Sequence, residues 1–158
     1  IPDSIPDPMR TEIIAHELVH IYQTRFPEDW SEFYTNSWGF QLFATPPPGM
    51  PASIRSSRRS NPDTWRTPWC CWRGRYWPVA IYNNTVSPTL RDSSTVWFDS
   101  QENRVLTEAP DEWTAFFGSV SQPEHPNEIA AVLIVSSDRS YEAGRRLQNW
   151  YQLHRFIG

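Results

Sequence analysis

The residues of this chain best suited to chemistry are two histidines four positions apart with a glutamate beside the first: His16, Glu17 and His20. On an α-helix, residues four apart share one face, so both imidazoles can bind a single ion. Zn²⁺ is commonly bound by imidazole nitrogens, and catalytic zinc keeps one position open for water. Glu17 lies about 100° around the helix from His16, within reach of that water. The spacing therefore predicts a zinc site with Glu17 as its general base.

A catalytic zinc ion usually has three protein ligands, so the two histidines need a partner from elsewhere in the chain. We expect Glu128, because it is the only acidic residue in the apolar segment 127–137. An unpaired carboxylate buried there would be costly, and a metal ion would neutralise it. The alternatives are Glu32, which follows the motif closely, His125, which neighbours Glu128, and Glu124.

Three further polar side chains are candidates for supporting roles. His125 or Tyr34 could donate a hydrogen bond to an oxyanion, a role that requires a donor held in place before charge develops. His125 could instead cap the following helix, and Tyr34 could pack in the core. Asp63 lies in the segment Asn-Pro-Asp-Thr and could accept a ring N–H from a metal-bound histidine. That segment also has good turn chemistry, so Asp63 has a second interpretation.

Helical periodicity places the motif on a helix of residues 9–24, preceded by an extended, proline-containing arm of residues 1–8. The apolar side chains on this helix predict a core face opposite the two histidines: Ile14, Ala15, Leu18, Val19, Ile21 and Tyr22. A second helix is expected from Pro27 to about residue 40, since proline is favoured in the first helical turn.

Beyond the helices, residues 45–68 contain six prolines and predict a long loop that lines the site or wraps the core. Residues 76–82 are typical of a strand, and residues 95–98 and 105–107 of a hairpin. Further helices are expected from Pro110 to Gly118, from Pro126 onward, and over residues 140–156. These elements predict an α+β fold with a helical majority.

The motif residues resemble the zincin metallopeptidases, and in particular the gluzincins, whose third ligand is glutamate. The metzincin continuation would need glycine at position 23 and histidine at position 26, where this chain has Gln23 and Phe26. A looser similarity to an uncharacterised group of small zincins covers the following segments: 16–23, Phe26-Pro27, Phe33-Tyr34, Trp38-Gly39-Phe40, 61–64 and 125–129.

This resemblance implies a zincin-like fold, in which the motif helix packs with further helices and a small antiparallel sheet. It also implies Zn²⁺ as cofactor and Glu128 as a ligand, because Glu128 begins a Glu-x-x-Ala turn like those of gluzincins. Glu128 follows His20 by 108 residues, more than in the best-known gluzincins. The expected β hairpins would then be an insertion between the two metal-binding helices.

Length and composition limit the remaining possibilities. With 158 residues and 39% hydrophobic residues, we expect one domain over residues 1–158. The net charge of −4 and the lack of a dense basic run argue against a nucleic-acid surface. No apolar run approaches the ~20 residues that a membrane span requires. The only cysteines, Cys70 and Cys71, are adjacent, which predicts two free thiols instead of a disulfide framework.

Together these features predict a zinc-dependent hydrolase that cleaves peptide or amide bonds in a peptide or protein substrate. The alternative is a zincin-like domain that acts as a binding or structural subunit of a larger assembly, with a structural metal or none. Its nine tryptophans would then supply an interface. Because the chain begins with Ile1 and not methionine, we expect a processed secreted or organellar protein, or a fragment.

Overall fold

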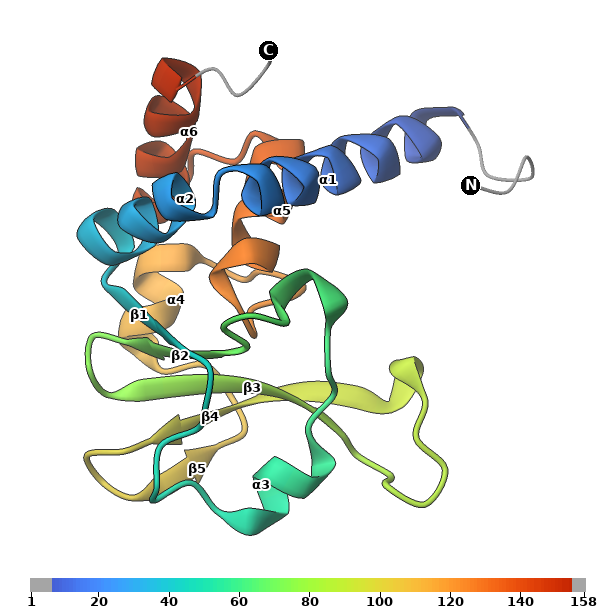
Figure 1. Cartoon of the computed structure of the whole chain (residues 1–158), viewed down its shortest axis with the longest axis vertical. Helices are drawn as coiled ribbons and strands as arrows, with labels where there is room; N and C mark the ends of the chain where they lie inside the picture. The colour runs from blue at the N-terminus through green and yellow to red at the C-terminus, as the bar shows by residue number, and fades with distance from the viewer. Residues whose placement is uncertain (1–6, 155–158) are drawn as a thin grey trace.

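The computed structural model describes residues 7–154, without the side chain of Pro8, and shows a mixed α+β fold. Within that part of the chain, five helices gather at one end of the molecule and an antiparallel sheet occupies the other (Figure 1). The helices of the first group are α1 (Asp7–Arg25), α2 (Pro27–Phe33), α4 (Asp111–Phe117), α5 (Pro126–Ser136) and α6 (Glu142–His154). A sixth, α3 (Ala52–Ser57), lies at the sheet end (Figure 1).

The sheet is a meander in which each strand pairs with the next along the chain, in the order β1-β2-β3-β4-β5. Its strands are β1 (Phe40–Phe43), β2 (Trp69–Trp72), β3 (Tyr76–Tyr82), β4 (Ser93–Asp99) and β5 (Arg104–Leu106). The predicted strand 76–82 is confirmed, as is the hairpin of β4 and β5. The sequence did not reveal β1 or β2, because each has only four residues and β2 is buried along its whole length, without polar alternation.

The motif helix, α1, is present, and the predicted core face is correct for Val19 and Tyr22, which are buried, but wrong for three other residues. Ile14 and Ile21 are each 53% exposed and Leu18 is 41% exposed, whereas His20 and Gln23 are almost completely buried. The helix contacts α5 through His16, His20 and Gln23, which is possible because these polar groups hydrogen-bond to one another and to α5. The predicted arm 1–8 is wrong at Asp7, which already belongs to α1, and residues 1–6 lie outside the described part.

The helix predicted from Pro27 to residue 40 is shorter than expected. After α2 the chain continues as a single π-helical turn, Tyr34–Trp38, and then enters β1. Gly39 separates the two elements, with a φ of +86° that is accessible to glycine at little cost. The turn buries Tyr34 and Trp38, which places the Tyr34 hydroxyl among the polar groups of α1 and α5.

The proline-rich segment 45–68 is not the continuous loop that was predicted. It contains α3 and a 3₁₀ turn, Pro62–Thr64, whose first residue is a proline. Pro51 precedes α3 directly, so two of the prolines introduce helical turns instead of preventing them. The 3₁₀ turn carries Asp63 and lies against the start of α5, because Asn127 donates a hydrogen bond to the Asp63 carbonyl.

The helices predicted after residue 109 are confirmed with shifted ends. Pro110 precedes α4 and Gly118, at φ +77°, ends it, while α5 begins at Pro126 as predicted. The final helix begins at Glu142, two residues later than expected, and is described as far as His154.

Two apolar clusters lie on opposite faces of the sheet. The larger one joins the sheet to the helices and is mainly aromatic, with Trp38, Phe40, Trp72, Trp113 and Phe117 among its members. The smaller one lies between the other face and α3. Cys70 belongs to the first and Cys71 to the second, since adjacent strand residues point to opposite faces. Both thiols are free, as predicted, and both are buried. Burial raises the pKa of Cys71 to about 11.

No helix in residues 7–154 has the length and apolar character needed to cross a bilayer.

Candidate metal centre

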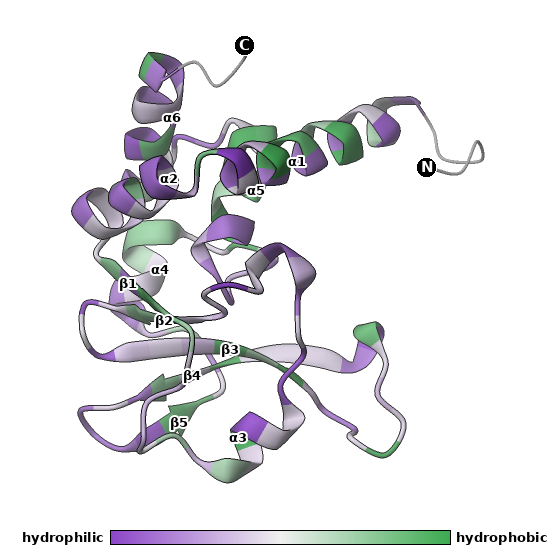
Figure 2. Cartoon of the chain, in the orientation of Figure 1, coloured by the Kyte–Doolittle hydropathy of each residue, from purple (hydrophilic) through white to green (hydrophobic). Residues whose placement is uncertain are grey.

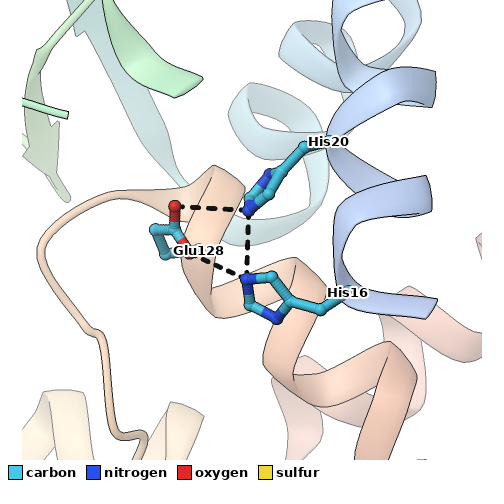
Figure 3. A group of neighbouring side chains, drawn as sticks. All are labelled: His16, His20 and Glu128. Atoms are coloured by element: carbon cyan, nitrogen blue, oxygen red, sulfur yellow. Dashed lines mark hydrogen bonds and ion pairs between the residues drawn. The ribbon is translucent and has the colours of Figure 1, made fainter. Parts of the chain in front are cut away.

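Two helices that are far apart in the sequence bring His16, His20 and Glu128 together. Figure 3 shows both imidazoles projecting from α1 toward the carboxylate at the start of α5. The Nε2 atom of His16 lies 3.2 Å from Oε2 of Glu128, and Nε2 of His20 lies 3.3 Å from Oε1. The two Nε2 atoms are 3.1 Å apart. Thus the lone-pair atoms of three good metal ligands face one another.

These separations fit a single tetrahedral ion. Ligand atoms bound at about 2.1 Å in tetrahedral geometry are about 3.4 Å from one another. The observed separations of 3.1 to 3.3 Å are close to that value without any movement of the helices. Imidazole and carboxylate are also the donor set of many zinc hydrolase sites. The residues present therefore fit a zinc ion.

Gln23 fixes the orientation of His20. Nδ1 of His20 donates to Oε1 of Gln23 at 2.8 Å, so Nε2 is directed at the cluster. The amide of Gln23 donates in turn to the Tyr34 hydroxyl at 3.0 Å and to the Asn127 carbonyl at 2.9 Å. Since the amide nitrogen has these two acceptors, its oxygen must face His20. This arrangement holds the ring of His20 in one orientation.

Tyr34 lies behind Gln23 and completes the same network. Its hydroxyl donates to Oδ1 of Asn127 at 2.9 Å, and only 1% of the residue is exposed. Burial raises the pKa of Tyr34 well above its usual value, so the phenol keeps its proton. In this structure the hydroxyl proton is directed at Asn127 and not at an open position beside the histidines.

Glu128 is held by the 3₁₀ turn as well as by the histidines. Nδ2 of Asn61 donates to its Oε1 at 2.8 Å, and only 3% of Glu128 is exposed. Burial by itself would raise the pKa of Glu128, but the hydrogen bond and charge of His20 lower it to about 2. In the same way, burial opposes the charge on His20, yet Glu128 raises the pKa of His20 to about 9. Without a metal ion, this pair therefore carries a proton on His20 at neutral pH.

Asp63 lies at the edge of the centre. Its Oδ2 atom is 3.8 Å from Nε2 of His20, on the side of the ring that faces the cluster. If Nε2 of His20 bound a metal ion, only Nδ1 could donate to Asp63, but Nδ1 is paired with Gln23. Asp63 is anchored by its own N–H, which donates to Asn61, and by its carbonyl, which accepts from Asn127. A second carboxylate, carried by the 3₁₀ turn, thus lies close to the site.

The other residues considered as third ligands lie elsewhere. His125 caps α5: its Nδ1 accepts from the Asn127 N–H at 3.1 Å, and its Nε2 donates to the Thr67 carbonyl at 2.7 Å. Burial lowers the pKa of His125 to about 4, which keeps the ring neutral. Glu124 forms an ion pair with Arg59 at 3.0 Å, and Glu32 is exposed on α2.

Comparisons with protein-family models, curated proteins and solved structures found no match to this chain.

Glu17 is exposed and lines an open hollow next to His16. The hollow has a volume of about 390 Å³ and lies between the first half of α1 and the second half of α5. Apart from Glu12, His16, Glu17 and Ser136, its lining is apolar and consists of Met9, Ile13, Val132 and Val135. An extended chain entering this hollow would pass both a metal-facing imidazole and the carboxylate expected to act as base.

Sequence reasoning missed three residues that hold the ligands in place: Gln23, Asn61 and Asn127. Two of them could have been considered from the sequence: Gln23 follows His20 by about one helical turn, and Asn127 directly precedes Glu128. Asn61 belongs to the Asn-Pro-Asp-Thr segment in which only Asp63 was considered. Metal-bound histidines and carboxylates usually have such partners, so neighbouring amides are worth examining in any comparable motif.

Proposed function

We propose that this chain is a zinc-dependent peptidase of the zincin type, with a gluzincin-like ligand set of His16, His20 and Glu128. The observation that carries the proposal is the spacing of three ligand atoms, from residues up to 112 positions apart, at the distances of a tetrahedral site. A histidine pair that was merely solvated on a helix surface would have no reason to face a buried carboxylate.

The chemistry follows from the residues around the site. A zinc ion held there would act as a Lewis acid, which polarises a substrate carbonyl and lowers the pKa of bound water. Glu17 accepts the proton of the attacking water and passes it to the leaving amine. Gln23 keeps Nδ1 of His20 occupied, so that Nε2 remains available as a ligand. Asn61 holds one oxygen of Glu128 in place. The partly apolar hollow beside His16 and Glu17 provides room for a peptide side chain.

Metal content and hydrolysis should be measured separately. After dialysis against buffer, elemental analysis should give close to one zinc per chain, and His16→Ala or Glu128→Ala should remove it. Glu17→Gln should retain the metal but lose at least about 100-fold of the hydrolysis rate on a quenched fluorescent peptide library, since it removes the general base. Glu32→Gln, an exposed glutamate on α2, is the matched control. Wild-type activity in Glu17→Gln would refute this mechanism.

The position of Asp63 favours one second candidate function, a structural metal site. Its carboxylate is 3.8 Å from Nε2 of His20, and 38% of the side chain is exposed, so it can turn toward an ion at the cluster. Four protein ligands would leave no position for water.

The two functions predict different results for Asp63→Asn. A structural site would lose metal affinity in this variant and would show no hydrolysis with any variant. If the site is catalytic, the Asp63→Asn variant should still bind zinc through three protein ligands. X-ray absorption of the wild type should then show an exchangeable water oxygen bound to the zinc.

A further inference from the structure

The outer face of α1 carries a stripe of exposed apolar side chains, Ile14, Leu18 and Ile21, called here the outer stripe. Their exposures of 53%, 41% and 53% are high for large aliphatic residues. Spacings of four and three residues place them on one narrow line along the helix. Figure 1 shows the first half of α1 projecting beyond the other helices, and Figure 2 shows hydrophobic positions along it. The stripe faces away from the side that carries His16 and His20.

The same spacing continues to both ends of the helix. Going outward, Thr11 and then Asp7 extend the outer stripe toward the N-terminus, and Arg25 extends it toward the C-terminus; all three are exposed. The steps of four, three, four, three and four residues are those of a coiled-coil seam. An acidic residue therefore ends the line at one end of α1 and a basic residue ends it at the other.

We propose that two copies of this chain form a dimer by packing their α1 helices antiparallel along the outer stripe. With Ile14 of each copy opposite Leu18 of the other, Thr11 lies opposite Ile21. The same register brings Asp7 of each copy to Arg25 of the other, so two ion pairs close the ends of the seam. A parallel pairing would instead place Asp7 beside Asp7 and Arg25 beside Arg25, and like charges would disfavour it.

This arrangement has a two-fold axis between Ile14 and Leu18, as expected for a closed homodimer. Six aliphatic side chains become buried, three from each copy. The helix is about 28 Å long at 1.5 Å per residue, and one helix pair is smaller than a standard stable interface. The dimer is therefore weak and concentration-dependent. The face of α1 that carries the histidines stays outside the interface, and the dimer does not rest on the proposed function.

Sedimentation velocity over a range of protein concentrations tests the proposal. The wild type should shift from monomer to dimer as concentration rises. Leu18→Arg should raise the dissociation constant at least about tenfold, because it places two charges in the apolar seam. Leu153→Arg is the matched control, since Leu153 is a leucine 82% exposed on α6. Its association should equal that of the wild type.

A charge exchange tests the antiparallel register. Asp7→Arg and Arg25→Asp should each weaken association, and the double variant should restore it. Both changes also oppose the helix dipole, so the double variant should melt no higher than either single variant. Restored association therefore cannot arise from restored helix stability.

Three results would overturn the proposal: a monomer at every concentration, a dimer that Leu18→Arg leaves intact, or a double variant no better than the single ones. Zinc content is measured in the same samples, so loss of metal and loss of the dimer remain distinguishable.

Discussion

Gln23 determines which nitrogen of His20 faces His16 and Glu128. Its oxygen accepts from Nδ1, and its amide nitrogen is fixed by Tyr34 and the carbonyl of Asn127. The sequence places Gln23 on the same side of the helix as the histidines, but the spacing gives no hint that it is 95% buried. Its burial depends on α5 and on the π-helical turn of Tyr34–Trp38, which supply its partners.

We predict that Gln23→Ala lowers zinc affinity about 10- to 100-fold, the usual cost of losing a partner of a metal-bound histidine. Affinity can be measured by competition with a chromogenic chelator. Gln41→Ala, at an exposed position of β1, should leave affinity unchanged. Equal affinities in wild type and Gln23→Ala would show that the ring of His20 is held by the packing alone.

The His20–Glu128 pair predicts a pH dependence of stability in chelator-treated protein. The pKa of His20 is about 9 in the folded chain, against 6.5 for an unperturbed histidine. The folded state therefore binds the proton more tightly, and the resulting stabilisation is complete below pH 6.5 and lost as pH rises through 9. Urea unfolding at pH 6, 8 and 10 should show this decline.

In the same series, His20→Gln should be less stable than the wild type at pH 6, and the difference should shrink by pH 10. A difference that is constant with pH would contradict the proposed charge pairing. The comparison with His20→Gln is needed because burial also raises the pKa of Cys71, which adds its own loss of stability at high pH.

At the scale of elements, His20 and Gln23 on the polar face of α1 are buried because α5 presents matching polar groups. An amphipathic helix normally buries its apolar side, since that removes more apolar surface from water. Here Glu128 and Asn127 at the start of α5 satisfy His20 and Gln23, so burial leaves none of these side chains without a partner. The aliphatic outer stripe is consequently left at the surface.

Packing of α6 also depends on one small residue. Gly144 lies in the buried side of this helix, and an added Cβ would collide with the backbone carbonyl of Asp138 in the preceding loop. We predict that Gly144→Ala destabilises the fold by roughly 1–3 kcal/mol despite the better helix propensity of alanine. Thermal and urea unfolding measure this.

Gly49→Ala is the control for that prediction. A Cβ at position 49 would meet only the ring of Phe98, at 4.0 Å, which is ordinary contact. Its stability should stay within about 0.5 kcal/mol of the wild type, as for most substitutions without a steric conflict. A Gly144→Ala variant as stable as Gly49→Ala would mean that the loop before α6 adjusts freely.

At the scale of the whole molecule, a bound ion would tie the beginning of the chain to its last third. His16 and His20 lie on α1 and Glu128 on α5, and the contact between these helices is the main packing of α1. The metal site exists in the folded chain but not in the unfolded one, so metal binding stabilises the fold.

We predict that zinc raises the melting temperature of chelator-treated protein in proportion to the logarithm of its free concentration. At about 1,000 times the dissociation constant, the gain in free energy of unfolding is ~4 kcal/mol. His16→Ala should reduce this gain strongly, whereas His154→Ala, at a histidine on α6, should keep it. An equal zinc response in His16→Ala would place the metal elsewhere.

Some properties of this protein follow from local sequence alone. The helix containing His16 and His20, strand β3, and the proline and glycine ends of α4 depend on spacing and on residues a few positions apart, so the sequence predicted them. The choice of Glu128 also came from the sequence, because a lone carboxylate in an apolar helix needs a partner wherever that helix packs.

Only the tertiary structure decided which residues of α1 are buried, which side chains hold the three candidate ligands, and where Asp63 lies. These depend on contacts between residues about 11 to 104 positions apart, and no local pattern specifies whether a polar face will find matching polar groups. Hydrophobic periodicity placed Val19 and Tyr22 in the core correctly but wrongly assigned Ile14, Leu18 and Ile21 to it. Hydrogen bonds and ion pairs to α5 compensate for burying His20 and Gln23 instead.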